Sequence, residues 1–284
     1  LTDWLTMTYN SRFTRTDFQN PSHIATDGGL FYHNNARYWP IVPVKDPNGY
    51  YVPESRVGVL KDGGRYKTQS DINSQQLSFQ ATPLEWWLIN AELNYRIENR
   101  NEHTDWLTTY AYDVNENPYV AFNNTSGVRE YNYKSNYFNP NIFTEYSRSF
   151  GSHNMKVMGG FQSEWMRPRN FTAIRDGVLS GLPTLDTTSS NPRVGGAYNK
   201  WTTAGFFGRV NYDYLSRYMF EANLRYDGSS RFLRDNRWNL FPSFSAGWNV
   251  GHEEFWENLS STINTFKLRA SWGELGNQNT DSWY

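Results

Sequence analysis

Apolar and polar residues alternate with a period of two along much of this chain, a period that is typical of β-strands. The longest run is NRWNLFPSFSAGWNV, residues 236–250, in which one face is apolar and the other is mostly polar or small. The apolar face consists of Trp238, Leu240, Pro242, Phe244, Ala246, Trp248 and Val250. Strands in globular proteins are usually about 5–6 residues long. A run of about twelve residues therefore predicts an unusually long strand whose apolar face contacts an apolar surrounding along its whole length.

Nine segments show this alternation and are predicted to be strands. They cover residues 5–13, 72–81, 85–98, 137–150, 154–165, 203–214, 217–228, 236–250 and 266–275. In the segment 85–98, for example, apolar residues from Trp87 to Ile97 share one face, while Glu92 and Arg96 lie on the other. The pattern predicts an all-β, antiparallel protein.

The connections between these segments alternate between long and short. Long loops are expected at 19–66, 99–133 and 167–198, and short turns at 82–84, 151–154 and 215–217. Outer-membrane barrels show this asymmetry, with short periplasmic turns and long extracellular loops. A soluble β-sandwich has loops clustered at both of its ends, so the alternation favours the barrel. The connection at 251–264 is long enough to hold a short helix.

The hairpin at 203–228 is specific enough for a prediction of its register. The predicted facing pairs are Tyr214 with Tyr218, Tyr212 with Phe220, Val210 with Ala222, and Gly208 with Leu224. On the other face, Asn211 is expected opposite Glu221, with Arg209 diagonal to it. A slip by one residue would move Arg209 and Glu221 to the apolar face, where an arginine costs about 2–4 kcal/mol at the middle of a bilayer.

Composition supports a membrane barrel. Mean hydropathy is −0.77, which is very polar, yet aromatic residues make up 18% of the chain. Disordered chains lack aromatics, and no run approaches the ~18 apolar residues of a transmembrane helix. A β-barrel reconciles these facts, because only alternate strand residues need to be apolar and aromatic residues gather at the two membrane interfaces.

Charge and cysteine content exclude other classes. The 27 Lys and Arg residues nearly balance 28 Asp and Glu residues, so nucleic acid is not expected as a partner. The absence of cysteine excludes disulfides and thiolate chemistry. The opening stretch LTDWLTMTYNSRF lacks the basic and apolar regions of a signal peptide, so the chain is expected to be an internal piece of a longer polypeptide.

No pattern indicates catalysis, a metal or a cofactor, and the protein is not expected to be an enzyme. The histidines are isolated from one another, at His23, His33, His103, His153 and His252. The stretch DVNEN at Asp113 begins like a calcium-binding loop. Pro118 then occupies the position that needs glycine, and Asn124 the position of the bidentate glutamate, so calcium is not expected there.

Two groups of residues are candidates for contact with ligands or partners. The polar faces of the predicted strands carry charges of both signs, expected to face a lumen, at Glu92, Arg96, Glu145, Lys156, Glu164, Arg209, Asp213, Glu221, Arg225, Asp227, Lys267 and Arg269. These residues either bind substrate or form a wall that is hydrogen-bonded to water and to protein that fills the lumen. Long loops carry aromatic residues that either stack on sugars or contact another protein or neighbouring loops, at Tyr38, Trp39, Tyr50, Tyr51, Trp106, Tyr110 and Tyr112.

Two local features need a structural explanation. The stretch DGSSRF at 227–232 resembles a turn, in which Gly228 is expected to supply a positive φ and Asp227 to cap it. Pro242 lies within a predicted strand although it has no N–H to donate, and a β-bulge there is the expected explanation. The small residues Ser243, Ser245 and Gly247 on the opposite face would allow another part of the protein to pack closely.

The late segments resemble a known family. The stretches GFFGRVNYDYLSRYMFEANLRYDGSSRF, NRWNLFPSFSAGWNV and FKLRASWGELGNQN, from 205 to 279, resemble the barrel strands of SusC/RagA-type TonB-dependent transporters of Bacteroidetes. The stretch 137–165 fits more loosely, and before Tyr133 only the architecture fits. The resemblance implies a barrel of about 22 strands in the bacterial outer membrane, filled by a plug domain. It also implies a SusD-like surface lipoprotein as lid, coupling to TonB through the plug region, and import of oligosaccharides or peptides.

The whole chain, 1–284, is therefore expected to be part of one barrel domain, with the plug and the remaining strands absent from it. Nine strands cannot close such a barrel, and an open sheet edge in lipid would leave backbone groups unpaired. The first hypothesis is a nutrient importer in contact with membrane lipid. The second is a soluble or surface glycan-binding or adhesion β-protein without transport. Dependence on detergent would discriminate between the two.

Overall fold

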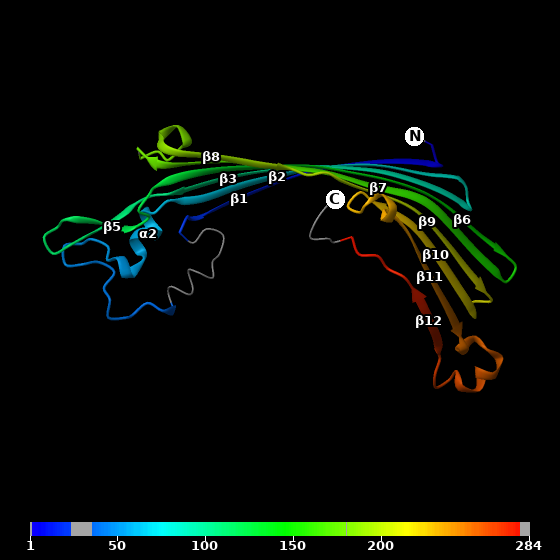
Figure 1. The fold of residues 1–284 in the computed structure, drawn as a ribbon. Helices are drawn as coiled ribbons and strands as arrows, with labels where there is room; N and C mark the ends of the chain where they lie inside the picture. Colours follow the sequence, from blue (N-terminus) through cyan, green and yellow to red (C-terminus); the bar gives the residue numbers. More distant parts are fainter. Residues whose placement is uncertain (1, 24–35, 180, 279–284) are drawn as a thin grey trace.

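In a computed structural model of the protein, which describes residues 2–23, 36–179 and 181–278, the chain forms one curved antiparallel sheet (Figure 1). The strands are β1 (Leu5–Pro21), β2 (Arg65–Leu84), β3 (Trp87–Trp106), β4 (Thr109–Tyr112), β5 (Pro118–Phe122), β6 (Gly127–Phe150), β7 (His153–Val178), β8 (Thr188–Tyr198), β9 (Trp201–Tyr214), β10 (Tyr218–Ser229), β11 (Trp238–Asn249) and β12 (Lys267–Gly273). The all-β antiparallel class predicted from the alternation is confirmed.

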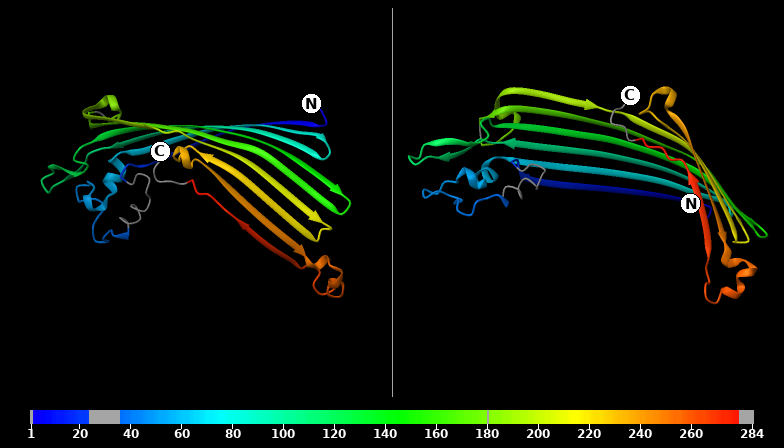
Figure 2. Two further views of the ribbon diagram at one scale, coloured as in Figure 1. Left: turned by 45° about the vertical axis from the view of Figure 1, so that its right-hand side comes forward. Right: turned by 60° about the horizontal axis from the view of Figure 1, so that its bottom comes forward.

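Nine strands are neighbours in the order β1-β2-β3-β6-β7-β9-β10-β11-β12, and each overlaps one of the nine predicted segments. Within the described residues, β8 pairs with β7 alone, and β4 pairs with β5 as a separate hairpin. The sheet is not closed. Strands β9 to β12 curve away from the plane of β1 to β3, as Figure 2 shows.

The two ends of the sheet differ in their connections. At one end, called the loop end here, lie the helix α2 (Val57–Asp62) and the hairpin β4–β5 (Figure 1). At the other, the turn end, β9 joins β10 through Leu215 and Ser216, whose φ angles of 56° and 54° are left-handed. Two consecutive positive φ values are typical of the tight hairpin turns that match strand twist. The connections β2–β3, β6–β7 and β9–β10 at this end are short, as expected, whereas the β11–β12 connection at the same end is longer.

The register of the β9–β10 hairpin is as predicted. Tyr214 faces Tyr218, and the ladder continues without a shift through Gly208 opposite Leu224. Asn211 faces Glu221 on the opposite side of the sheet. Because facing residues of antiparallel strands share a face, this register fixes which side chains belong together along the whole hairpin.

One face of the sheet is apolar and exposed. Phe220 and Phe244 remain 54% and 53% exposed, and Trp272 57%. A single-layer sheet has no second layer to cover such side chains, and water is a poor environment for them. Stacked aromatic rings lie towards both ends of this face: Tyr226 on Trp238 near the loop end, with centroids 5.0 Å apart, and Tyr214 on Tyr218 near the turn end, 6.5 Å apart.

The expected boundaries of two long loops are wrong. The stretch 99–133 is mostly strand, because β3 continues to Trp106 and β6 begins at Gly127. In the stretch 167–198, β7 continues to Val178 and β8 occupies much of the rest. Beyond the apolar region both faces of these strands carry polar side chains, so the alternation disappears while the ladder of hydrogen bonds continues. The loop expected at 19–66 is close to the observed 22–64, of which 24–35 lie outside the described residues.

The turn expected at Asp227 and Gly228 is also wrong. Both residues belong to β10, and Gly228 is absent from the glycines with positive φ. Glycine is needed there for space, because a Cβ atom would lie 2.5 Å from the Trp238 ring. Asp227 does not cap a turn; its carboxylate accepts hydrogen bonds from the Arg225 guanidinium at 3.0 and 3.1 Å.

Pro242 does not create a bulge. It faces Leu224 in an uninterrupted β10–β11 ladder. Its carbonyl accepts a hydrogen bond from the Glu274 N–H at 3.0 Å, and the N and O of one strand residue point to the same side. The missing donor therefore points towards β12, where the ladder begins only at Ser243 opposite Gly273. The proline removes a donor at the end of a ladder, where the loss is small.

The connection at 251–264 contains two 3₁₀ helices, η4 (Val250–His252) and η5 (Glu254–Leu259), where a short helix was expected. No helix in the described part of the chain is long and apolar enough to span a membrane.

The division into two faces can be tested with a pair of arginine substitutions in the intact protein. Phe220→Arg places a charge on the apolar face and should destabilise a membrane-embedded protein by about 2–4 kcal/mol. Asn223→Arg, three residues away on the polar face, should be tolerated. Heat-modifiable mobility of the folded protein on gels measures both. Loss of folding in Asn223→Arg alone would show that the faces are assigned wrongly.

Candidate functional site

The polar face of the sheet brings together all the charged strand residues predicted to face a lumen. Residues that face each other in the register point to the same side of the sheet, so the paired strands share this face. The pairs are Ser74–Arg96, Ser78–Glu92, Glu164–Thr203, Arg209–Asn223, Asn211–Glu221, Phe207–Arg225, Gly205–Asp227, Asp213–Met219, Gly247–Arg269 and Asn249–Lys267. Glu145 and Lys156 lie on the same face as a diagonal pair, two residues apart in the β6–β7 register. Residues from β3 to β12 therefore form one continuous polar surface.

Many of these side chains pair with one another. The carboxylate of Glu221 accepts hydrogen bonds from Asn211 at 2.5 Å and Asn223 at 2.8 Å, and Arg209 donates to Asn223 at 2.6 Å. Lys156 forms an ion pair with Glu145 at 2.7 Å. The charges thus satisfy each other across neighbouring strands, which supports the interpretation as a wall more than that as a preformed substrate site.

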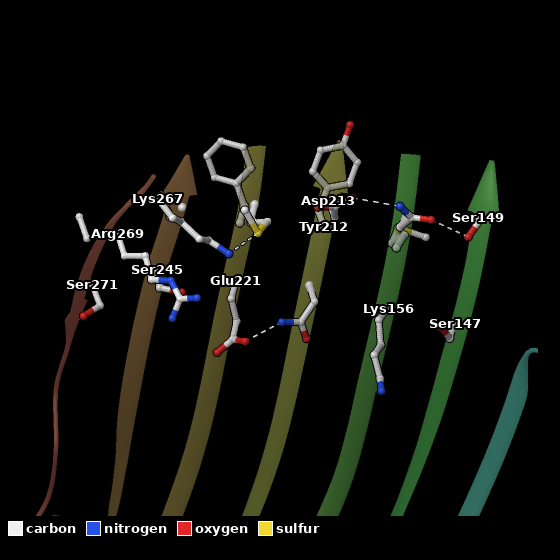
Figure 3. A pocket seen from close by; sticks show the side chains of 18 of the residues that line it. Ser147, Ser149, Lys156, Tyr212, Asp213, Glu221, Ser245, Lys267, Arg269 and Ser271 are labelled. Carbon is white, nitrogen blue, oxygen red and sulfur yellow. Dashed lines mark hydrogen bonds between the residues drawn. The ribbon is translucent and has the colours of Figure 1, made fainter. Parts of the chain in front are cut away.

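At the β11–β12 edge the polar surface changes character. Gly247, Ser245 and Ser271 leave room above the backbone, and Lys267 and Arg269 project beside them (Figure 3). Among the described residues, Arg269 has no ion-pair partner. These residues line part of a hollow of about 630 Å³ near the turn end. The hollow combines small side chains with charges of both signs, since Asp213 and Glu221 also line it, and the small residues leave room for close approach by another surface.

Sequence reasoning did not single out three uncharged members of this surface, Tyr137, Asn90 and Asn141. Tyr137 donates a hydrogen bond to Glu164 at 2.8 Å, and the Arg96 guanidinium lies 5.3 Å from the Tyr137 ring centroid. The side-chain oxygens of Asn90 and Asn141 are buried with no hydrogen-bond partner in the described residues. Asn90 lies an even number of residues from Glu92 on β3, and Asn141 an even number from Glu145 on β6, so the alternation places them on the polar face. This position is the feature of the sequence that could have identified them.

The loop aromatics divide into two groups. Tyr50 stacks on Tyr112 with centroids 3.9 Å apart, and Tyr51 lies between the ammonium groups of Lys45 and Lys61, at 4.9 and 5.5 Å. These rings hold the loops to one another.

The remaining loop aromatics differ in exposure. Trp39 and Tyr110 are 69% and 57% exposed, so their faces are open to a ligand. Tyr38 donates to the Val42 carbonyl at 2.6 Å, and Trp106 packs against Gly127. Two of the predicted contact residues therefore keep open faces, and the others are engaged in internal contacts.

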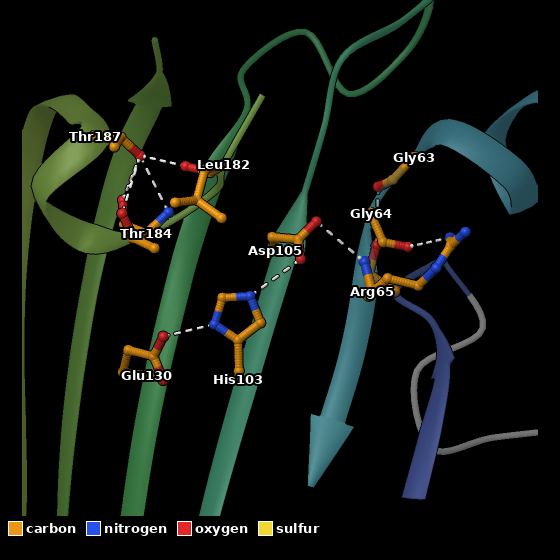
Figure 4. A network of polar contacts seen from close by, with 10 residues as sticks. Gly63, Gly64, Arg65, His103, Asp105, Glu130, Leu182, Thr184 and Thr187 are labelled. Atoms are coloured by element: carbon orange, nitrogen blue, oxygen red, sulfur yellow. Dashed lines mark hydrogen bonds and ion pairs between the residues drawn. The ribbon is translucent and has the colours of Figure 1, made fainter. Parts of the chain in front are cut away.

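A polar network holds α2 to the wall near the loop end, on the same side of the sheet as the apolar face (Figure 4). His103 donates to Glu130 at 2.6 Å and to Asp105 at 3.1 Å. Asp105 is 4% exposed and also accepts the Arg65 N–H at 3.1 Å. Hydrogen bonds to Asp105 and Glu130 raise the pKa of His103 to about 9, so this histidine is charged at neutral pH.

The described residues contain no group of three or more His, Asp or Glu side chains placed to hold a metal ion. The carboxylate of Asp113, which begins the stretch resembling a calcium loop, accepts the N–H groups of Asn115 and Asn117 at 2.8 Å each. Hydrogen bonds from Asn117 and then Asn115 lower the pKa of Asp113. Asp113 therefore shapes a tight turn between β4 and β5.

The fold and its two faces define a class. An antiparallel sheet with an exposed apolar face, a charged opposite face and aromatic clusters near both ends is part of the wall of a transmembrane β-barrel. The family described as "TonB dependent receptor-like, beta-barrel" matches residues 4–284. The chain belongs to the TonB-dependent receptor β-barrel family.

Named relatives agree with this family. The chain is 35% identical over 167 residues to TonB-dependent receptor SusC of Bacteroides thetaiotaomicron, covering 57% of this chain and 16% of that protein. It is 35% identical over 158 residues to TonB-dependent receptor P3 of Formosa agariphila, covering 52% of this chain and 15% of that one. The match therefore spans about one sixth of either curated relative. The suspected SusC/RagA-type resemblance is confirmed.

Solved structures show the same fold. The structure titled "Structure of the RagAB peptide transporter" superposes with a TM-score of 0.71 at 16% identity, covering 96% of this chain and 31% of that chain. The structure of the RagAB peptide importer in its "open-open" state gives a TM-score of 0.61 at 19% identity, over 78% of this chain and 24% of that chain. The open sheet thus corresponds in fold to part of a larger barrel.

The His103 network predicts a specific pH dependence of stability. Because the pKa of His103 in the folded protein, about 9, lies above the ordinary value of 6.5, its contribution is complete below about pH 6.5 and is lost as pH rises through about 9. Thermal unfolding of the intact protein should therefore lose more stability between about pH 6 and 10 than unfolding of His103→Gln. The exposed His252→Gln serves as control and should follow the unmodified protein. Parallel curves for all three proteins would exclude this role of His103.

Proposed function

We propose that the chain forms part of the wall of an outer-membrane transporter that imports nutrients in a TonB-dependent manner. This proposal rests mainly on one observation: within the apolar region, the nine neighbouring strands have an exposed apolar face and an opposite polar face, in a member of the TonB-dependent receptor family. In this proposal the apolar face contacts membrane lipid and the polar face lines the lumen. The named relatives are TonB-dependent receptors, which supports transport over catalysis.

The proposed partners follow from the same resemblance. A plug domain would pack on the polar face, and the hollow beside Ser245, Gly247 and Ser271 offers room for close backbone approach. TonB would act through the plug, and a SusD-like surface lipoprotein would cover the loop end. The exposed faces of Trp39 and Tyr110 are available there for a lid or a ligand.

Oligosaccharides are the first candidate substrates and peptides the second. Sugar rings stack on open aromatic faces, and Trp39 and Tyr110 present such faces on two separate loops. Peptide import is supported by the likeness in fold to RagAB, a peptide transporter. A lumen wall with charges of both signs is compatible with either, because it does not select for one sign of net charge.

The choice between a transporter and a soluble glycan-binding protein can be tested by extraction. The intact protein should be found in the outer-membrane fraction and should stay monodisperse only in detergent, because its apolar face needs a nonpolar surrounding. Gel filtration with and without detergent measures this. A monodisperse protein in detergent-free buffer would contradict the transporter proposal.

Substrate class can be tested by uptake. A strain that lacks the intact protein should lose uptake of a labelled oligosaccharide and keep uptake of labelled peptides, or the reverse if peptides are the substrate. In the complemented strain, Trp39→Ala and Tyr110→Ala should each raise the substrate concentration at half-maximal uptake by about 2–10-fold. One aromatic stack contributes about 0.5–1.5 kcal/mol.

The chain offers matched controls for these two substitutions. Ile41 and Val114 are 81% and 94% exposed in the same two loops but have no ring. Ile41→Ala and Val114→Ala should leave uptake unchanged. Equal effects of the aromatic and aliphatic substitutions would argue against stacking on a sugar. An unchanged uptake of both labelled classes in the deletion strain would argue against the import proposal itself.

A further inference from the structure

The connection between β11 and β12, residues 250–266, folds back over the apolar face at the turn end. It follows Trp248 on β11, which shares the apolar face with Tyr218 of β10 in the register. The backbone N–H of Asn249 donates to the Arg217 carbonyl at 2.7 Å, which joins the start of this connection to the β9–β10 turn. The segment therefore starts next to Trp248 and Tyr218, and its first residues are hydrogen-bonded to the β9–β10 turn.

One buried carboxylate fixes the side of the sheet on which the segment lies. Glu253, which is 9% exposed, accepts hydrogen bonds from the Trp248 indole at 2.9 Å and the Tyr218 hydroxyl at 2.7 Å. Arg217 adds an ion pair at 3.3 Å. Because Trp248 and Tyr218 both point from the apolar face, Glu253 holds the segment on that face and away from the polar one.

A second set of contacts closes the segment into a compact unit. The Trp256 indole donates to the Ile263 carbonyl at 3.0 Å, and its ring stacks on Phe266 with centroids 5.0 Å apart and an interplanar angle of 14°. The Gly251 N–H donates to the Phe266 carbonyl at 3.0 Å, which ties the start of the segment to its end. The unit therefore has a defined outer surface.

That outer surface is unusually apolar for a connecting segment. Phe255, Leu259 and Ile263 remain 63%, 48% and 47% exposed. The Phe255 ring lies against Trp248, with centroids 6.5 Å apart at an edge-to-face angle, so the patch continues the apolar face of the strands. Residues 250–266 contain no lysine or arginine, and Glu254 and Glu257 are exposed on the same unit.

We propose that residues 250–266 form a membrane-interface segment whose apolar side chains enter the lipid leaflet at the turn end. Amphipathic segments bind in this way when an apolar side is buried at the boundary between headgroups and acyl chains. Two observations favour lipid over a protein partner: the patch is continuous with the apolar face of nine strands, and Glu253 directs it to that face. The lack of basic residues indicates zwitterionic phospholipid, because segments that bind anionic lipid are rich in lysine and arginine. The inference depends on the barrel being embedded in a membrane.

Spin labels in the intact protein, reconstituted in nanodiscs of phosphatidylethanolamine and phosphatidylcholine, test the proposal. This chain has no cysteine, so labels are introduced one at a time by Phe255→Cys and Leu259→Cys, with Glu254→Cys and Glu257→Cys as matched controls on the same unit. Collision rates with oxygen, which partitions into lipid, and with a water-soluble nickel chelate report the surroundings of each label. Oxygen collisions should exceed nickel collisions several-fold at positions 255 and 259, with the reverse at 254 and 257.

Three other outcomes would overturn the proposal. High nickel accessibility at all four positions would place the segment in water. Low accessibility to both reagents at 255 and 259 would show that protein covers the patch. A clear rise in oxygen preference when anionic phosphatidylglycerol is added would contradict the zwitterionic assignment. Heat-modifiable mobility of each labelled protein confirms that its barrel is folded, so a misfolded sample is recognised and replaced by a label at Ile263. Uptake is measured separately from spin-label accessibility, so a failure of this inference can be distinguished from a failure of the import proposal.

Discussion

Pairing of backbone hydrogen-bonding groups is the constraint on which the rest of this structure depends. In a bilayer no water is available to an N–H or C=O group, so each must be paired within the protein. The strands meet this demand with long ladders; β3 and β6, for example, pair residue by residue from Trp87 opposite Tyr146 to Trp106 opposite Gly127. Even Pro242, which has no N–H, lies where its missing donor points to the end of a ladder.

Once the ladders are fixed, the two faces follow from register. A slip by one residue would exchange every apolar side chain for a polar one, so side chains and backbone specify the same arrangement. The polar face reinforces it through cross-strand pairs such as Glu145 with Lys156. The apolar face contributes through aromatic stacks such as Tyr226 on Trp238. Neither face forms a closed core, and therefore the surroundings of the sheet determine its stability.

Alternation predicted most of the strands, and it failed where its physical cause is absent. Between Leu5 and Phe13, or Trp87 and Ile97, one face is apolar, and the pattern identified both strand and face. Beyond that region, at His103 for example, polar side chains occupy both faces, so strands were taken for loops. Gly228 was misjudged because its role, room for the Trp238 ring, depends on a neighbouring strand and not on local turn chemistry. The charged polar-face residues were found from parity, whereas Asn90 and Asn141 carry no charge to draw attention.

The length of the strands has a consequence for how the wall responds to its surroundings. At about 3.3 Å per residue, the 24 residues of β6 extend about 80 Å, and a strand needs only about 9–11 residues to cross the hydrocarbon layer. More than half of such a strand therefore stands in water, held by contacts such as Arg15 with Asp71 and His103 with Glu130. Salt and pH act on that half, whereas lipid thickness and composition act on the other. One continuous ladder thus couples two regions whose stabilities are governed by different variables.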